Sequence, residues 1–241
     1  IVGELDARLK YWNEALLLWI QLNDKGKVAR LHRRISEALY AKGEKERAGE
    51  HLDQASEILE TMPENVELAW LYITKADEKM WFAGDMAESR SWAEKAVALA
   101  EKLNDSETTA ESYLSLGNAC WGTGDLRKAV ECFEMALKIA LDNNYAETAL
   151  RAYRNLGYAL PADESNTIQR RLEYAKKGYE LAKKVGAIRD QSLIATDLSG
   201  MYWGMGESNE SIAFIEESMS LDRKTGDMPH LYSNLITMAW G

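Results

Sequence analysis

The chain has 241 residues, of which 46% are hydrophobic and 28% are charged, so it holds enough apolar material to bury a sizeable core. Lysine and arginine number 29 against 39 aspartates and glutamates, and the net charge of -10 disfavours general binding to nucleic acid or to anionic membranes. Three prolines, two cysteines and the lack of a long apolar run argue against a loop-rich β protein, a disulfide framework and a membrane-spanning helix. No signal peptide opens the sequence, and we expect an acidic, mostly helical protein of the cytoplasm.

One short pattern recurs along the chain: an aromatic residue, two further residues, a glycine and an acidic residue. It occurs as ALYAKGE at 38–44, KMWFAGD at 79–85, ACWGTGD at 119–125 and MYWGMGE at 201–207. Successive glycines are 41, 40 and 82 positions apart, and because the last step is twice 41, one copy is expected near residue 165. There Pro161 and a polar turn replace the glycine. A fixed period of this length is typical of a repeat protein.

A second pattern lies in the segment that follows each glycine, where small or apolar residues are spaced by four and by three. The copies are Ala48-x3-Leu52-x2-Ala55, Ser89-x3-Ala93-x2-Ala96, Ala129-x3-Phe133-x2-Ala136, Arg171-x3-Ala175-x2-Gly178 and Ser211-x3-Ile215-x2-Ser218. These spacings put the residues on one helical face, where small side chains let a neighbouring helix approach closely. Each unit is therefore predicted to be a helix, a glycine-containing turn and a second helix, repeated as an all-α solenoid.

In chain order we predict five full repeats between two partial ones, all within one solenoid domain at 1–241. The partial repeats are a second helix at 1–24 and a first helix at 228–241, and the full repeats cover 27–61, 64–104, 107–143, 146–186 and 189–225. Because both ends fall in the middle of a repeat and the chain has no initiating methionine, we interpret it as a fragment of a longer protein.

The third repeat resembles the tetratricopeptide repeat (TPR). The family pattern W-x2-L-G-x2-Y, then A-x3-F and a later small residue, is matched by Tyr113-x2-Leu116-Gly117-x2-Cys120 followed by Ala129, Phe133 and Ala136. The fourth repeat keeps Tyr153, Leu156 and Gly157 in the same register. The resemblance implies an all-α, right-handed α-α superhelix of about six helix pairs with partial terminal repeats. It also implies a binding module and not an enzyme.

Two stretches are similar to a particular subset of these arrays, RAYRNLGYAL at 151–160 and EYAKKGYELAKKVG at 173–186. They resemble the repeat arrays of prokaryotic signalling ATPases, including STAND proteins and LuxR-type activators, and of multidomain adenylate cyclases. In those families the array is a sensor or partner-binding arm, which implies that role in a signal-transduction ATPase or transcription activator here. Two alternatives stay open, a stand-alone scaffold or adaptor and the regulatory segment of a multidomain cyclase or kinase.

Catalytic and cofactor motifs are absent from the sequence. It holds no phosphate-binding or dinucleotide-binding glycine loop, no H-E-x-x-H and no C-x-x-C, so we expect no cofactor and no metal. His32, His51 and His230 are interpreted as solvent-facing or packing residues in three different repeat contexts. Cys120 and Cys132 are interpreted as buried thiols in a reducing compartment.

In TPR proteins the first helix of each repeat lines a concave groove, and the resemblance implies which residues here face a ligand. The candidate binding residues are Arg30, Arg33, Arg34, Lys75, Trp81, Asn118, Trp121, Arg151, Arg154, Asn155, Tyr158, Trp203 and Asn234. The same register adds Phe82, Thr196, Asp197, His230 and Trp240. These residue types suit a peptide or protein segment, because arginine clamps carboxylates, asparagine pairs with main-chain amides and tryptophan buries apolar area. A small-molecule inducer is the alternative ligand.

Asn155 and Asn234 carry the strongest expectation of a ligand role. Asparagine is a poor residue inside a helix, so a structural reason for it is less available. By resemblance, both occupy the position whose asparagine grips a peptide main chain. Nucleic acid is the weakest partner, since only the basic residues of 27–34 favour it.

Other candidates have an equally direct structural interpretation. The aromatic residues Tyr40, Trp81, Trp121 and Trp203 recur at one phase, which is typical of a wedge between successive first helices. Arginines on the same helices would then pair with carboxylates of their neighbours, at a gain of only tenths of a kcal/mol each, which is roughly the value of a surface ion pair.

Overall fold

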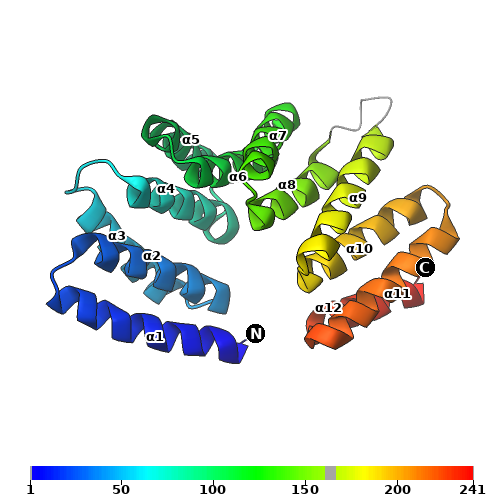
Figure 1. Cartoon of the computed structure of the whole chain (residues 1–241), viewed down its shortest axis with the longest axis horizontal. Helices are drawn as coiled ribbons and strands as arrows, with labels where there is room; N and C mark the ends of the chain where they lie inside the picture. The colour runs from blue at the N-terminus through cyan, green and yellow to red at the C-terminus, as the bar shows by residue number, and fades with distance from the viewer. Residues whose placement is uncertain (1, 161–166, 241) are drawn as a thin grey trace. The chain divides into compact units, whose positions relative to one another are not determined.

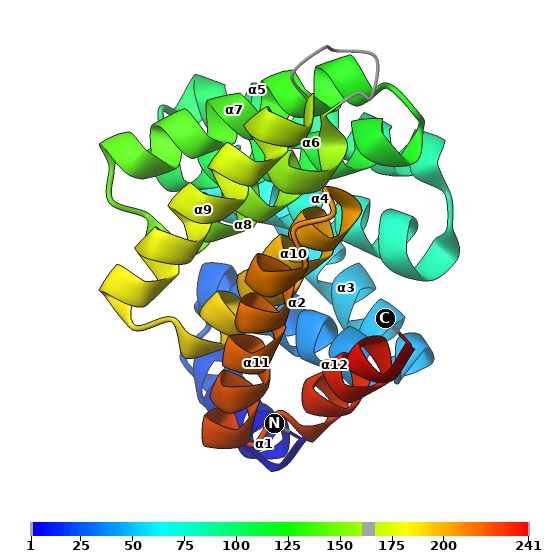
Figure 2. The same ribbon diagram turned by 90° about the vertical axis from the view of Figure 1, so that its right-hand side faces the viewer.

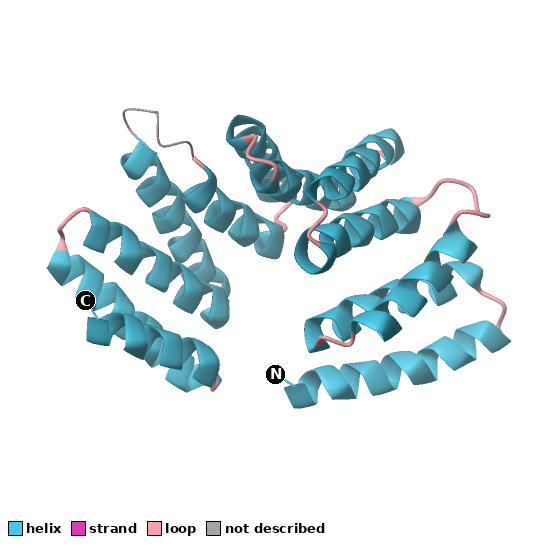
Figure 3. Ribbon diagram, turned by 180° about the vertical axis from the view of Figure 1, so that it is seen from behind, coloured by secondary structure: helices cyan, strands magenta, loops and turns pink. Residues whose placement is uncertain are grey.

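The computed structural model describes residues 2–160 and 167–240, with side chains for residues 5–160 and 167–238. Within these residues the chain forms helices and no strand (Figure 3). The helices are α1 (Val2–Gln21), α2 (Lys25–Lys42), α3 (Lys45–Leu59), α4 (Val66–Glu78) with a π-helical extension (Lys79–Ala83), α5 (Met86–Leu103), α6 (Ser106–Gly122), α7 (Leu126–Asp142), α8 (Ala146–Ala159), α9 (Thr167–Val185), α10 (Ile188–Gly204), α11 (Ser208–Thr225) and α12 (Met228–Trp240). The predicted all-α class is confirmed, as is the predicted repeat of two helices joined by a short turn.

Glycine follows the first helix of a repeat because the backbone there takes a left-handed conformation. Gly43 and Gly84 have φ values of 81° and 75°, and Gly124 and Gly206 have 82° and 80°. A residue with a side chain is strained in this region and glycine is not, which makes glycine the usual residue just past a helix C-terminus. The turn predicted near residue 165, with Pro161, lies outside the described residues.

The polar linkers between repeats supply N-caps. The side chain of Asp24 accepts a hydrogen bond from the backbone N–H of Lys27 at 3.0 Å, and that of Asp105 accepts one from Thr108 at 2.9 Å. Asn65 caps α4 in the same way, at 3.2 Å. Such caps satisfy backbone donors that have no partner within the helix, and each is worth about 1 kcal/mol.

The chain divides into two compact units, Ile1–Asp125 and Leu126–Gly241, which we describe separately. In the N-terminal unit, α2 packs on α1 and α3, and α5 packs on α4 and α6 (Figure 1). In the C-terminal unit, α8 packs between α7 and α9, and α11 packs between α10 and α12 (Figures 1 and 2). No helix within the described residues is long and apolar enough to cross a membrane.

The small-residue pattern of the second helices forms the core, as predicted. Its buried members are Ala48, Leu52, Ala55, Ser89, Ala93, Ala96, Ala129, Phe133, Ala136, Ala175, Gly178, Ser211, Ile215 and Ser218. Gly178 gives the reason for small size, because a Cβ atom added there would lie 2.9 Å from Cβ of Tyr153 on α8. Arg171 is the exception in the pattern, since it is only half-buried.

Enlarging a member of this pattern is expected to destabilise the protein. Ala136 on α7 is fully buried, so Ala136→Leu should lower the free energy of unfolding by about 1–3 kcal/mol through overpacking. Ser106→Leu, at the first residue of α6, should change it little. Urea denaturation of the two variants is the measurement, and equal losses of stability would contradict the assignment of Ala136 to the core.

Candidate binding site

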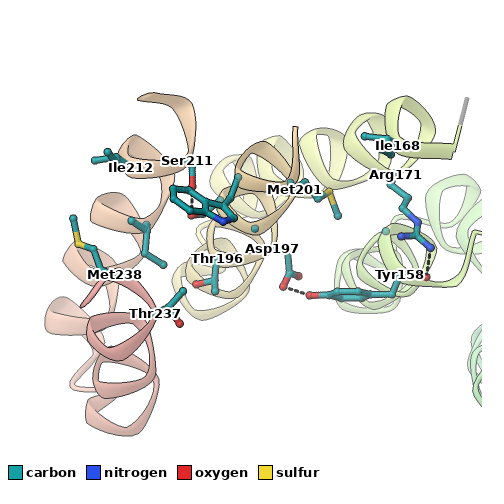
Figure 4. Close-up of a pocket in the computed structure, with 16 residues that line it drawn as sticks. Tyr158, Ile168, Arg171, Thr196, Asp197, Met201, Ser211, Ile212, Thr237 and Met238 are labelled. Atoms are coloured by element: carbon teal, nitrogen blue, oxygen red, sulfur yellow. Dashed lines mark hydrogen bonds between the residues drawn. The ribbon is translucent and has the colours of Figure 1, made fainter. Parts of the chain in front are cut away.

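The C-terminal unit contains a cavity of about 730 Å³, lined by residues of α8, α9, α10, α11 and α12 (Figure 4). Most of its wall is apolar, and the large apolar side chains are Ile168, Met201, Trp203, Ile212, Ile215 and Met238. This volume lies in the range of natural ligand sites, which combine an apolar wall with a few placed polar groups.

Tyr158 and Asp197 form the polar end of the cavity and point toward one another from α8 and α10 (Figure 4). The Tyr158 hydroxyl donates a hydrogen bond to Oδ1 of Asp197, while Oδ2 lies 3.6 Å from Nε of Arg154. Burial raises the pKa of Asp197, and the hydrogen bond from Tyr158 and the charge of Arg154 act in the opposite direction. Burial and the neighbouring carboxylate also raise the pKa of Tyr158. The cavity therefore contains one desolvated carboxyl group.

Arg171 ties α9 to the end of α8. Its Nη2 donates hydrogen bonds to the backbone oxygens of Tyr158 and Leu160, at 3.0 Å and 2.5 Å. A cation at a helix C-terminus is favourable because the last carbonyls of a helix have no partner within it. The charge of Arg171 thus stabilises the wall of the cavity beside Asp197.

A buried polar network lies beside the cavity, between α10, α11 and α12. Thr196, which lines the cavity, donates to Oδ1 of Asn234 at 3.1 Å. The Asn234 amide donates to Ser218 at 2.9 Å and to Oδ2 of Asp222 at 3.0 Å. The other oxygen of Asp222 accepts from Ser192 and lies 2.9 Å from Nδ1 of His230. Hydrogen bonds therefore help to hold α12 against α10 and α11.

The predicted site residues of the C-terminal unit lie in different environments, and only some of them line the cavity. Tyr158 and Trp203 line the cavity, together with Thr196 and Asp197 from the same register. Arg154 reaches its edge by pairing with Asp197, and Arg151 and Asn155 are half-buried on α8. Asn234 is 1% exposed and lies inside the polar network. Asn234 therefore has a structural role inside its helix, although asparagine is a poor residue there. The side chain of Trp240 lies outside those described.

Two of the three predicted arginines of the N-terminal unit, Arg30 and Arg33, form ion pairs. Arg33 is 3% exposed, lies 2.5 Å from Glu37 and 3.5 Å from Glu67, and has its guanidinium 5.2 Å from the ring centre of Trp70. Arg30 pairs with Glu67, and Arg34 is exposed. Because Arg33 is buried and pairs with two carboxylates, its geometry favours a structural role.

The other predicted residues of this unit lie on α4, its π-helical extension and α6. Lys75 is half-buried, 3.6 Å from Glu60 and 4.6 Å from the ring centre of Trp92, and Asn118 is half-buried on α6. Trp81 and Trp121 are 58% and 48% exposed. None of these four residues lines the cavity of the C-terminal unit.

The recurrent aromatic residues do not share one role. Tyr40 is buried and stacks on Phe82 with ring centres 4.6 Å apart, as the wedge interpretation predicts. The three tryptophans at the same phase are each about half exposed, so they are much less buried than Tyr40. Trp203, at 53% exposure, is the one that lines the cavity.

The expectation that the three histidines lie in separate contexts is also wrong. His32 on α2 and His51 on α3 meet within one repeat, with 2.9 Å between their Nδ1 atoms. Burial lowers the pKa of His32 to about 4 and lowers that of His51 as well. Cys120 and Cys132 are both buried, as predicted. Among the described residues no cluster of three or more histidine, cysteine, aspartate or glutamate side chains could hold a metal ion.

Second helices also contribute residues to the cavity, and these were not among the predicted site residues. Ile168 and Arg171 come from α9, and Ser211 and Ile212 come from α11. Ile168 and Ile212 are about half exposed although they are apolar. An isoleucine outside the core phase of its helix was the signal that could have found them.

The fold and a sequence match together define the class of protein. The family model for the tetratricopeptide repeat matches residues 67–142, and the helices of the described residues form a TPR-like helical-repeat fold. No curated protein sequence matches the chain.

Solved structures share the fold at low sequence identity. BtubC from P. vanneervenii is 13% identical with a TM-score of 0.74, and the match covers 92% of each chain. The Rap conjugation gene regulator of plasmid pLS20, in complex with the Phr* peptide, is 20% identical with a TM-score of 0.69 over 88% of this chain and 58% of that one. A STAND protein with a TPR sensor from Pyrococcus horikoshii is 17% identical with a TM-score of 0.66, over 88% of this chain and 32% of that one. The chain thus spans a little over half of the Rap regulator and a third of the STAND protein.

Proposed function

We propose that this chain binds a peptide or protein segment in the cavity of its C-terminal unit and serves as the sensor or regulatory arm of a signalling protein in the cytoplasm. The observation that carries the proposal is the cavity itself, with Tyr158, Trp203 and Asp197 on a mostly apolar wall. Exposed aromatic side chains in a pocket are the residues that dominate the affinity of protein interfaces. Binding, and not catalysis, is the activity we assign to it.

The comparisons support this choice of ligand and role. The Rap regulator, a TPR-like neighbour, is solved with the Phr* peptide, and the STAND neighbour carries a TPR sensor. A regulatory arm predicts that a bound peptide changes the activity of the longer protein that carries this chain. Binding without such an effect would favour the scaffold alternative.

Selection of random heptapeptides displayed on phage, followed by fluorescence anisotropy with the selected peptides, tests the site. Trp203→Ala and Tyr158→Ala should each weaken binding at least tenfold, because each removes an aromatic contact from the cavity. Trp81→Ala is the matched control, since Trp81 is equally exposed but belongs to the other unit, and it should leave binding unchanged. Failure to select any peptide, or loss of binding in Trp81→Ala alone, would contradict the proposal.

A further inference from the structure

Two glycines of α10 face the cavity without any reason in the packing of the protein. Gly200 and Gly204 both line it, and a Cβ atom added to either would meet no atom within 4 Å. This distinguishes them from Gly178 and Gly122, where an added Cβ would lie 2.9 Å and 2.7 Å from its nearest neighbour. Glycine inside a helix lowers stability relative to alanine, and Gly200 lies well within α10. The space above these glycines is therefore available to a ligand.

Glycine leaves the backbone of α10 bare along one side of the cavity. Gly157 on α8 also lines the cavity, and a Cβ added there would meet only Cε of Met201, at 3.4 Å. Residues 197, 200 and 204 lie on one face of α10, because spacings of three and four bring side chains into line. From Asp197 to Gly204 this strip is about 10 Å long at 1.5 Å per residue. An extended chain of about three residues spans the same length.

The acidic side chain of the cavity lies at one end of the strip, and it is the group there to which a cationic side chain can bind. Among the lining residues, Asp197 is the acidic one, and its side chain is 13% exposed. Oδ2 of Asp197 is 3.6 Å from Nε of Arg154, which is longer than a hydrogen bond, so it can accept one from a ligand. Nη2 of Arg171 donates to backbone oxygens of α8, while its Nε is buried without a hydrogen-bond partner. The chain as a whole carries a net charge of -10, which attracts a basic partner.

We infer that the ligand is an extended peptide segment whose main chain lies against Gly200 and Gly204, with a lysine or arginine side chain at Asp197. Bulky apolar side chains of the same segment contact Ile212 and Met238 on the opposite wall (Figure 4). This inference rests on the proposed function and adds the chemistry of the peptide and the residues that select it. Gly200 acts by leaving room, and Asp197 acts by charge.

Three sets of fluorescein-labelled hexapeptides are the probes. Each set has leucine, isoleucine, valine or phenylalanine around one fixed central residue, which is lysine, glutamine or glutamate. Binding to the whole chain is measured by fluorescence anisotropy. The lysine set should bind at least tenfold more tightly than the glutamate set, and Asp197→Asn should abolish that preference while binding of the glutamine set persists.

Gly200→Ala separates a role in binding from a role in folding. The substitution should raise the temperature of unfolding, because alanine favours helix and the added methyl group meets no protein atom. It should weaken binding of the lysine set at least tenfold, because the methyl group occupies the strip. Gly49→Ala is the matched control in α3, where the nearest atom to an added Cβ is the Tyr40 hydroxyl at 4.0 Å. It should raise the temperature of unfolding and leave binding unchanged.

The outcomes separate this inference from the proposed function. If all three sets bind equally and Gly200→Ala binds like the unaltered chain, peptide binding stands and the arrangement along α10 is overturned. If no set binds the unaltered chain, the proposed function fails together with this inference.

Discussion

Asp222→Ala is expected to lower the free energy of unfolding by about 3 kcal/mol, because it leaves buried hydrogen-bond donors without their acceptor. Asp222 is 1% exposed, and its two oxygens form hydrogen bonds with Ser192, Asn234 and His230. Without the carboxylate, these donors are left in a site that water does not reach, and each unsatisfied donor carries its own desolvation penalty. The loss should be concentrated in α12, because Asn234 and His230 are the residues through which that helix joins the network.

Urea denaturation gives the change in stability, and hydrogen exchange gives its location. Backbone amides of 228–238 should lose protection in Asp222→Ala, while those of α7 should be much less affected. Asp142→Ala is the control, since Asp142 makes only an exposed ion pair with Lys138 and its removal should be nearly silent. A loss of stability as small as that of the control would show that the network contributes nothing to the packing of α12.

Acid is expected to destabilise the N-terminal unit through His32 and His51. The 2.9 Å separation of their Nδ1 atoms requires one nitrogen to carry a proton and the other to lack one, so the accepting ring must be neutral and the two rings cannot both be cationic. Because the folded pKa of His32 is lowered to about 4, the unfolded chain binds more protons between that value and an ordinary histidine pKa of about 6.5. The stabilising contribution of the neutral ring is fully present above pH 6.5 and is lost as the pH falls toward 4. The loss amounts to about 3 kcal/mol at most.

The measurement is the free energy of unfolding of the intact chain and of His32→Gln at pH 7.5 and pH 4.5. Acidification should destabilise the variant less than the intact chain, since glutamine does not titrate. His51→Gln should show the same direction, because burial also lowers the pKa of His51. An equal loss in the intact chain and both variants would assign the acid sensitivity to carboxylates.

The helices and the core could be read from the sequence because both follow from local rules. Residues such as Ala93 and Ala136 recur at spacings that define one helical face, and that face is buried. Glycines such as Gly84 mark positions where the backbone φ is positive, a property of the residue itself. These constraints act within a few residues of the chain, so they are visible in its order.

The site could be predicted only in part, because a cavity depends on how several helices meet. Register placed Tyr158 and Trp203 on first helices, and both line the cavity. It also assigned Asn234 to a ligand, although partners on two other helices turn that amide inward. The register rule excluded second helices, and so Ile212 was missed. The exposure of each side chain is set by neighbours about 40 positions away, which no local pattern reports.

The N-caps and glycines of the first helices stand at one constant separation. Asp24 precedes Gly43, Asn65 precedes Gly84 and Asp105 precedes Gly124 by the same number of residues, and Ala187 precedes Gly206 likewise. The second helices differ in length, from 15 residues in α3 to 20 in α1. The constant part of these repeats is thus the first helix with its cap and its glycine, and the segment between successive glycines becomes an interchangeable part. Excising or duplicating one such segment should yield a shorter or longer array with its remaining joints intact.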